Sequence, residues 1–148
     1  MFLRTHRVGR SVYTEALESY RDPITGRPKH RCIARWRDRS FAVALAEARA
    51  QFGNTSESRA YWQGILDGTV RPRVRGLRHR SPDKPREARR NLAVLDQGVA
   101  HLAGLEAVHA KLAPAAEADI QAATEAVRLR MEQNRQETKA FTPPAPPP

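Results

Sequence analysis

The chain has 148 residues, a formal net charge of +10 and a mean hydropathy of −0.67. This length suits one domain with a moderate core rather than a large catalytic scaffold. The sequence contains no run of about 18 apolar residues, the length needed to span a membrane. The opening residues also lack the apolar stretch of a signal peptide. We therefore expect a cytoplasmic protein without membrane contact. Cys32 is the only cysteine, which excludes an intramolecular disulfide.

The positive charge is concentrated in the first part of the chain. Residues 1–90 contain 21 Lys and Arg against 9 Asp and Glu, whereas residues 91–148 contain 5 against 7. Such segregation predicts that one part of the molecule meets polyanions and the other does not. Arginine outnumbers lysine 22 to 4, and guanidinium groups suit phosphates and guanine edges. A genome rich in G and C also favours arginine codons, so the excess of arginine over lysine is weak evidence by itself. The uneven distribution of charge along the chain is the stronger indication of a polyanionic partner.

The opening of the chain has the pattern of three β-strands, at about residues 2–8, 12–20 and 29–36. The second run is rich in β-branched and aromatic residues. Gly9-Arg10-Ser11 is a turn signal, and Asp22-Pro23-Ile24-Thr25-Gly26 predicts a hairpin connection.

The third run alternates, which predicts a half-buried strand with one mostly apolar and one mostly cationic face. Cys32 is interpreted as a small apolar side chain of this strand rather than a thiol nucleophile. The core face of the second run stays open, because Glu15 and Glu18 fall on opposite sides. The predicted faces of the third run are His30, Cys32, Ala34 and Trp36 on one side, and Lys29, Arg31, Ile33 and Arg35 on the other.

Two helices are expected next. Ser40 is a suitable N-cap for the first and Gly53 a plausible C′ residue. The second is expected from about Asn54, with Glu57 as a capping-box partner and Gly68 at its end. Each has an apolar stripe at helical spacing. The stripes consist of Phe41, Ala44, Leu45, Ala48 and Phe52 in the first helix, and of Tyr61, Trp62, Ile65 and Leu66 in the second.

Residues 71–85 are predicted to form an exposed basic linker or arm. Prolines and a glycine interrupt regular structure there, and acidic residues are scarce. The alternative is a solvated hinge with no partner. The candidate phosphate contacts in this segment are Arg71, Arg73, Arg75, Arg78 and Arg80.

Residues 86–140 are predicted to form a helical hairpin. Apolar residues recur every three or four positions up to Pro114, and a second helix is expected from about residue 115 to 139. The leucine stripe of the first helix is expected to pack on the alanine-rich stripe of the second. The two stripes are Leu92, Leu95, Val99, Leu102, Leu105, Val108 and Leu112, then Ile120, Ala123, Val127 and Met131.

The fate of the remaining apolar surface of this hairpin stays open. A homodimer through residues 86–140 is one interpretation, and packing back on the N-terminal module is the other. The proline-rich residues 141–148 are expected to be disordered. The predicted fold is thus an α+β protein. It has a three-stranded antiparallel sheet with one or two helices in residues 1–70, then the basic linker, the hairpin and the tail.

No catalytic constellation is visible. The chain has no phosphate-cradling glycine loop and no supported Ser/His/Asp arrangement. Its carboxylates are scattered, and its five histidines show no metal-ligand spacing. We therefore expect a protein that is not an enzyme and holds no metal or cofactor.

Three stretches carry a resemblance to known DNA-contacting modules. They are Phe2-Leu3-Arg4, Leu17-Glu18-Ser19-Tyr20-Arg21-Asp22 and Gly26-Arg27-Pro28-Lys29-His30-Arg31-Cys32-Ile33-Ala34. Together they resemble the N-terminal region of bacterial insertion-sequence transposases. The strand, turn, strand and helix order is also similar to the arm-binding domain of phage-type integrases, whose sheet enters the DNA major groove. The resemblance covers about residues 1–50.

The resemblance implies DNA contact without strand-transfer chemistry. Arg35-Trp36 stands where the transposase pattern usually has Leu-Gly, and the catalytic residues of both families have no counterpart. The matched positions that would face DNA are Arg27, Lys29, Arg31 and Arg35.

The leading hypothesis is therefore a non-catalytic protein that binds double-stranded DNA, as an accessory or regulatory protein, or a remnant, of a mobile genetic element. One alternative is a helical oligomerisation or adaptor protein whose basic half contacts an acidic partner. Another is RNA binding.

Overall fold

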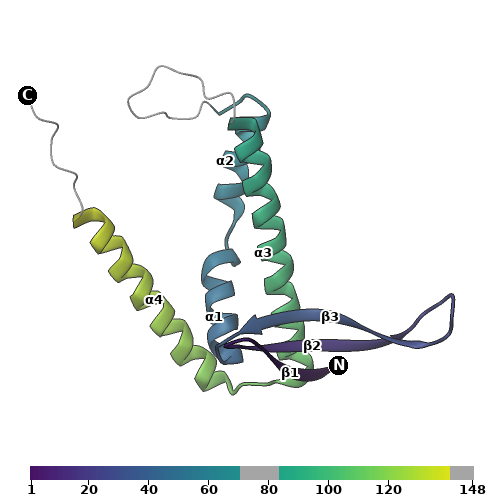
Figure 1. Ribbon diagram of the computed structural model, residues 1–148. Helices are drawn as coiled ribbons and strands as arrows, with labels where there is room; N and C mark the ends of the chain where they lie inside the picture. The colour runs from purple at the N-terminus through teal and green to yellow at the C-terminus, as the bar shows by residue number, and fades with distance from the viewer. Residues whose placement is uncertain (71–83, 141–148) are drawn as a thin grey trace, which may run out of the picture.

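The computed structural model describes residues 1–70 and 84–140 (Figure 1). Within these residues a three-stranded antiparallel sheet is followed by helices, which confirms the predicted α+β class. The elements are β1 (Phe2–Val8), β2 (Ser11–Arg21), β3 (Pro28–Arg37), α1 (Phe41–Phe52), α2 (Ser56–Leu66), α3 (Lys84–Leu112) and α4 (Glu117–Ala140).

The strand order is β1-β2-β3, and both connections are tight turns. Val8 pairs with Ser11 across the first turn, where Gly9 has a φ of 61°. In the second turn the Asp22 N–H donates to the Arg27 carbonyl over 2.9 Å, and Gly26 has a φ of 65°. Both glycines occupy the left-handed region that other residues rarely adopt. The three strands and the turns between them are confirmed.

A β-bulge in β3 changes which side chains share a face. Ala34 pairs with Ala16, but Leu17 pairs with Cys32, so Ile33 is an extra residue without a partner. The alternation of β3 reverses at that point. The predicted single cationic face is therefore wrong: Arg35 lies opposite Glu15 on one face, and Arg31 lies opposite Glu18 on the other.

The bulge also separates Cys32 from the predicted apolar face of this strand. Ala34 and Trp36 are buried in the core as predicted, whereas Cys32 is exposed. The Ile33 carbonyl lies against α3, because a Cβ added to Gly104 would come within 2.3 Å of that oxygen. The absence of a side chain at Gly104 thus lets α3 approach the backbone of the bulge.

The link from β3 to α1 is built by local hydrogen bonds. Asp38 adopts a φ of 52°, and its side chain accepts the Val12 N–H at 2.6 Å. Ser40 caps α1 by accepting the Val43 N–H at 3.3 Å, as predicted. Gly53 ends α1 as predicted, but as the C-cap residue, with a φ of −66° in the right-handed region, rather than as the C′ residue.

The core lies around α1, which sits between α3 and α4 (Figure 1). Leu45 of α1, Leu105 and Val108 of α3, and Ile120 of α4 are essentially inaccessible to solvent. The expected packing of the two long helices on one another is not what the structure shows. Each packs on α1 instead, so the hairpin folds back on the N-terminal module.

The α2 helix packs against the first half of α3. It begins at Ser56 after Thr55, which makes no side-chain cap hydrogen bond, so the predicted capping box with Glu57 is absent from this helix. Gly68 follows the helix with a φ of 74°. The α3 helix begins at Lys84, inside the segment predicted as linker.

The first half of α4 packs in the core, whereas the second half is exposed and is joined to α1 by the ion pair of Arg130 with Glu47 at 2.8 Å. Ile120, Ala123 and Val127 are buried as predicted, whereas Met131 is 39% exposed. Residues 128–138 are exposed throughout, and in Figure 1 this part of α4 diverges from α1 and α3. In the α3 stripe, Leu105 and Val108 are buried and Leu102 and Leu112 are partly buried against the same core, whereas Val99 is exposed.

Candidate nucleic-acid interface

The β2–β3 hairpin extends beyond the third strand. Phe2 at the start of β1 pairs with Leu17, so β1 does not accompany β2 past that residue. Residues 18–31 therefore form a two-stranded ribbon, which points away from the helices in Figure 1. A protruding ribbon of this kind has the dimensions to enter a groove of a nucleic acid duplex.

A buried carboxylate organises the ribbon tip. Asp22 is only 7% exposed. Its side chain accepts the Ile24 N–H at 3.0 Å and the Thr25 hydroxyl at 2.9 Å, and pairs with Lys29 Nζ at 2.5 Å. The Lys29 ammonium, with these hydrogen bonds, lowers the pKa of Asp22. The charge of Lys29 is consequently balanced within the turn.

Two arginines flank this turn without such a balance. Arg21 ends β2 and Arg27 precedes β3, and both are exposed. Within residues 1–70 and 84–140 neither makes an ion pair with an acidic side chain. Their guanidinium groups therefore keep their hydrogen-bonding capacity for an anionic partner.

Arg31 belongs to a different cluster, on the face of the ribbon nearer α3. Arg31 Nη2 lies 2.6 Å from Glu18 Oε2, and Lys111 Nζ of α3 lies 3.0 Å from Glu18 Oε1. These two cations, Arg31 first, lower the pKa of Glu18 to about 2. One carboxylate thus holds the root of the ribbon to α3 and leaves a net positive charge.

Arg35 lies on the opposite face of the sheet. The residues that cluster there are called the outer face, and they are Arg4, His6, Tyr13, Glu15 and Arg35. Glu15 is shared by Arg4 at 2.7 Å and Arg35 at 3.5 Å, and the Arg4 hydrogen bond is the main reason that its pKa is lowered. The Arg35 guanidinium also stacks over Tyr13, 4.4 Å from the ring centroid. This face combines excess positive charge with an aromatic surface.

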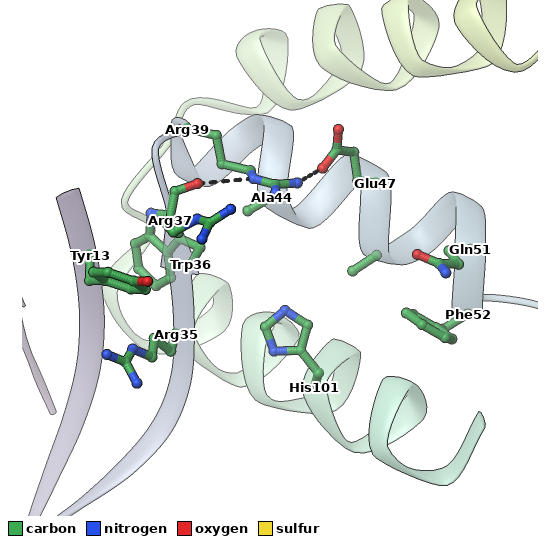
Figure 2. Close-up of a pocket in the computed structure, with 11 residues that line it drawn as sticks. Tyr13, Arg35, Trp36, Arg37, Arg39, Ala44, Glu47, Gln51, Phe52 and His101 are labelled. Carbon is green, nitrogen blue, oxygen red and sulfur yellow. Dashed lines mark hydrogen bonds and ion pairs between the residues drawn. The ribbon is translucent and has the colours of Figure 1, made fainter. Parts of the chain in front are cut away.

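A hollow of about 390 Å³ opens beside β3, between α1 and α3. Figure 2 shows Arg37 and His101 pointing toward it, while Arg35 points away. Arg39, which donates to the Arg37 carbonyl at 3.2 Å, pairs with Glu47. Burial, and then Arg39, lowers the pKa of His101. Among the described residues, the charged side chains that line the hollow are Arg35, Arg37, Arg39 and the single carboxylate Glu47, so its wall has a net positive charge that suits a phosphate group.

The predicted site residues are thus only partly brought together. Arg27 and Lys29 lie at the ribbon tip, whereas Arg31 and Arg35 lie on opposite faces. Sequence reasoning missed two basic residues. Arg21 could have been found from its place directly before the predicted turn, whereas the role of Arg37 depends on the fold. The predicted arm contacts and the proline-rich tail, residues 141–148, lie outside the described residues. The arm contacts are Arg71, Arg73, Arg75, Arg78 and Arg80.

Two features are absent from the part of the chain that the structure describes. None of its helices is long and apolar enough to cross a membrane. It holds no group of three or more His, Cys, Asp or Glu side chains arranged to bind a metal ion.

Comparison of this chain with protein families, with curated proteins and with solved structures found no match.

Proposed function

We propose that this protein binds double-stranded DNA without catalysing a reaction on it, and that the β2–β3 ribbon enters a groove of the duplex. The observation that carries the proposal is the protruding ribbon of residues 18–31, with Arg21 and Arg27 exposed at its tip. β-Ribbons read DNA from either groove, and arginines beside them bind the phosphates.

The charge balance of the sheet supports a polyanionic partner. Glu15 and Glu18 each bind two basic side chains rather than one. Both clusters therefore keep a net positive charge while their geometry is held by ion pairs. A carboxylate that is already paired with two cations repels an approaching phosphate only weakly.

The hollow beside β3 extends this basic surface. Arg37 of the hollow and Arg35 of the outer face both lie on β3, which continues into one side of the ribbon. A duplex seated on the ribbon would meet further cations as it runs along β3. Phosphate contacts of this kind supply most of the affinity and make it depend on salt.

The biological setting is proposed from the resemblance. The likeness of residues 1–50 to transposase N-terminal regions and integrase arm-binding domains supports a cytoplasmic accessory or regulatory protein of a mobile genetic element.

The test is a titration of labelled duplex DNA with the full chain at several salt concentrations. The variant Arg21→Ala/Arg27→Ala should bind more weakly, and the slope of log K against log salt should fall by about 2, one for each lost phosphate contact. The matched control is Arg7→Ala/Arg10→Ala, which removes the same charge near the other end of β2.

Two results would contradict the proposal. One is the absence of salt-sensitive binding by the unmodified protein. The other is an equal loss of affinity in both double variants, which would mean that net charge, not the ribbon, determines binding. Competition with a structured RNA of equal length decides between the two nucleic acids, and stronger binding of the RNA would replace duplex DNA as the partner.

A further inference from the structure

The ribbon tip presents an unusual apolar side chain. Ile24 is 92% exposed, more than any other large apolar residue in the described part of the chain, and it directly follows Pro23. Single exposed apolar residues are common on protein surfaces and need no explanation by themselves. What distinguishes Ile24 is how the tip holds this residue and which groups surround it.

The backbone that carries Ile24 is held in place. Its N–H donates to Asp22 Oδ1 at 3.0 Å, and the Gly26 N–H donates to the Asp22 carbonyl at 2.8 Å. The Thr25 hydroxyl donates to the same carboxylate at 2.9 Å. A side chain on such an ordered turn loses little backbone entropy when it inserts into a partner.

The surroundings indicate the chemistry of that partner. Arg21 and Arg27 stand on either side of the turn that exposes Ile24. An apolar protein groove would have to desolvate these charges, which is costly. Stacked base pairs between two phosphate strands offer an apolar interior next to two rows of negative charge. Architectural DNA-binding proteins that bend the duplex combine the same elements, basic side chains and an apolar wedge such as Ile or Pro.

We propose that Ile24 inserts between two base pairs from the minor groove while Arg21 and Arg27 bind phosphates of the two strands, so that the protein kinks duplex DNA. This inference rests on the proposed DNA binding and specifies its geometry. The minor groove of B-form DNA is only about 6 Å wide, so the ribbon requires the groove to open, as a kink makes it do. Pyrimidine–purine steps unstack most easily and are the expected insertion points.

The experiment measures DNA bending by energy transfer between dyes at the two ends of a duplex. The duplex has about 30 base pairs, well below the ~150 base-pair persistence length, and contains a central TA step. The unmodified full chain should bend it by about 20–90°. Ile24→Ser should bind with less than about a tenfold change in affinity, because the lost insertion and the saved unstacking largely offset each other, and should leave the duplex straight.

Two controls separate the wedge from general effects. Ile24→Leu keeps an apolar side chain of similar size at the tip and should retain the bend. Val8→Ser removes an apolar side chain that is 57% exposed near the other end of β2, and it should bend DNA like the unmodified protein.

The outcomes distinguish this inference from the proposed function. Binding without bending by the unmodified protein, or unchanged bending by Ile24→Ser, would overturn the wedge and leave DNA binding intact. Loss of bending in Val8→Ser would overturn it too. If the unmodified protein fails to bind duplex DNA, both proposals fall.

Discussion

The helical body and the β2–β3 ribbon are stabilised by different means. Around α1 the structure depends on apolar burial, with Leu45, Leu105 and Val108 fully enclosed. The ribbon buries little apolar surface, and it is ordered by strand pairing and by the ion pairs of Glu18 and Asp22. If the ribbon binds DNA as proposed, the residues that determine shape and those that bind lie in separate regions. Substitutions in the body should then cost stability, whereas the ribbon tip presents charge and an apolar side chain without a role in the core.

The largest effect on stability is expected in the body. Leu105→Ala removes a fully buried side chain of α3 from the hydrophobic core, so the free energy of unfolding should fall by about 2–5 kcal/mol. Val94→Ala, on the same helix but 49% exposed, should cost less than about 0.5 kcal/mol. Denaturant unfolding followed by circular dichroism measures both, and similar losses would contradict the described core.

The junction of the two regions should respond next. Gly104→Ala would ordinarily stabilise a helix by about 1 kcal/mol. Here the new methyl group would meet the Ile33 carbonyl at 2.3 Å, so we expect a loss of about 1–3 kcal/mol instead. The same unfolding measurement checks the sign. A gain in stability would show that α3 does not approach the β3 bulge closely.

The ion pair at the ribbon root should make stability depend on pH. Arg31 and Lys111 lower the pKa of Glu18 from 4.5 to about 2. The folded state therefore favours the ionised form, and this contribution is present above pH 4.5 and is lost as the pH falls from 4.5 to 2. At pH 7 Glu18→Gln should be less stable than the unmodified protein, and the difference should shrink over that range. A difference that does not vary with pH would contradict this role.

The smallest effect on stability is expected at the ribbon tip. Arg21→Ala/Arg27→Ala should change the free energy of unfolding by less than about 0.5 kcal/mol, because neither side chain makes an ion pair within the described residues. Thermal unfolding of the variant checks this. A large loss would mean that these arginines support the fold, and the separation of shape from binding would fail.

The local pattern of the sequence was sufficient for the elements themselves. Turn residues, the β-branched and aromatic residues of the second run and the alternation of the third predict the strands, and Ser40 with the apolar stripe after it predicts α1. These features depend on neighbours a few residues apart, which a sequence displays directly. The concentration of positive charge in the first 90 residues is likewise a property of the sequence alone.

The tertiary structure decided which residues share a surface. The bulge at Ile33 places Arg31 and Arg35 on opposite faces. The position of this bulge depends on the register of β3 with β2 and on the close approach of Gly104. An apolar stripe likewise states that a helix has a buried side but not which element covers it. For that reason α3 and α4 could be predicted as helices, while their shared partner α1 emerged only from the three-dimensional packing.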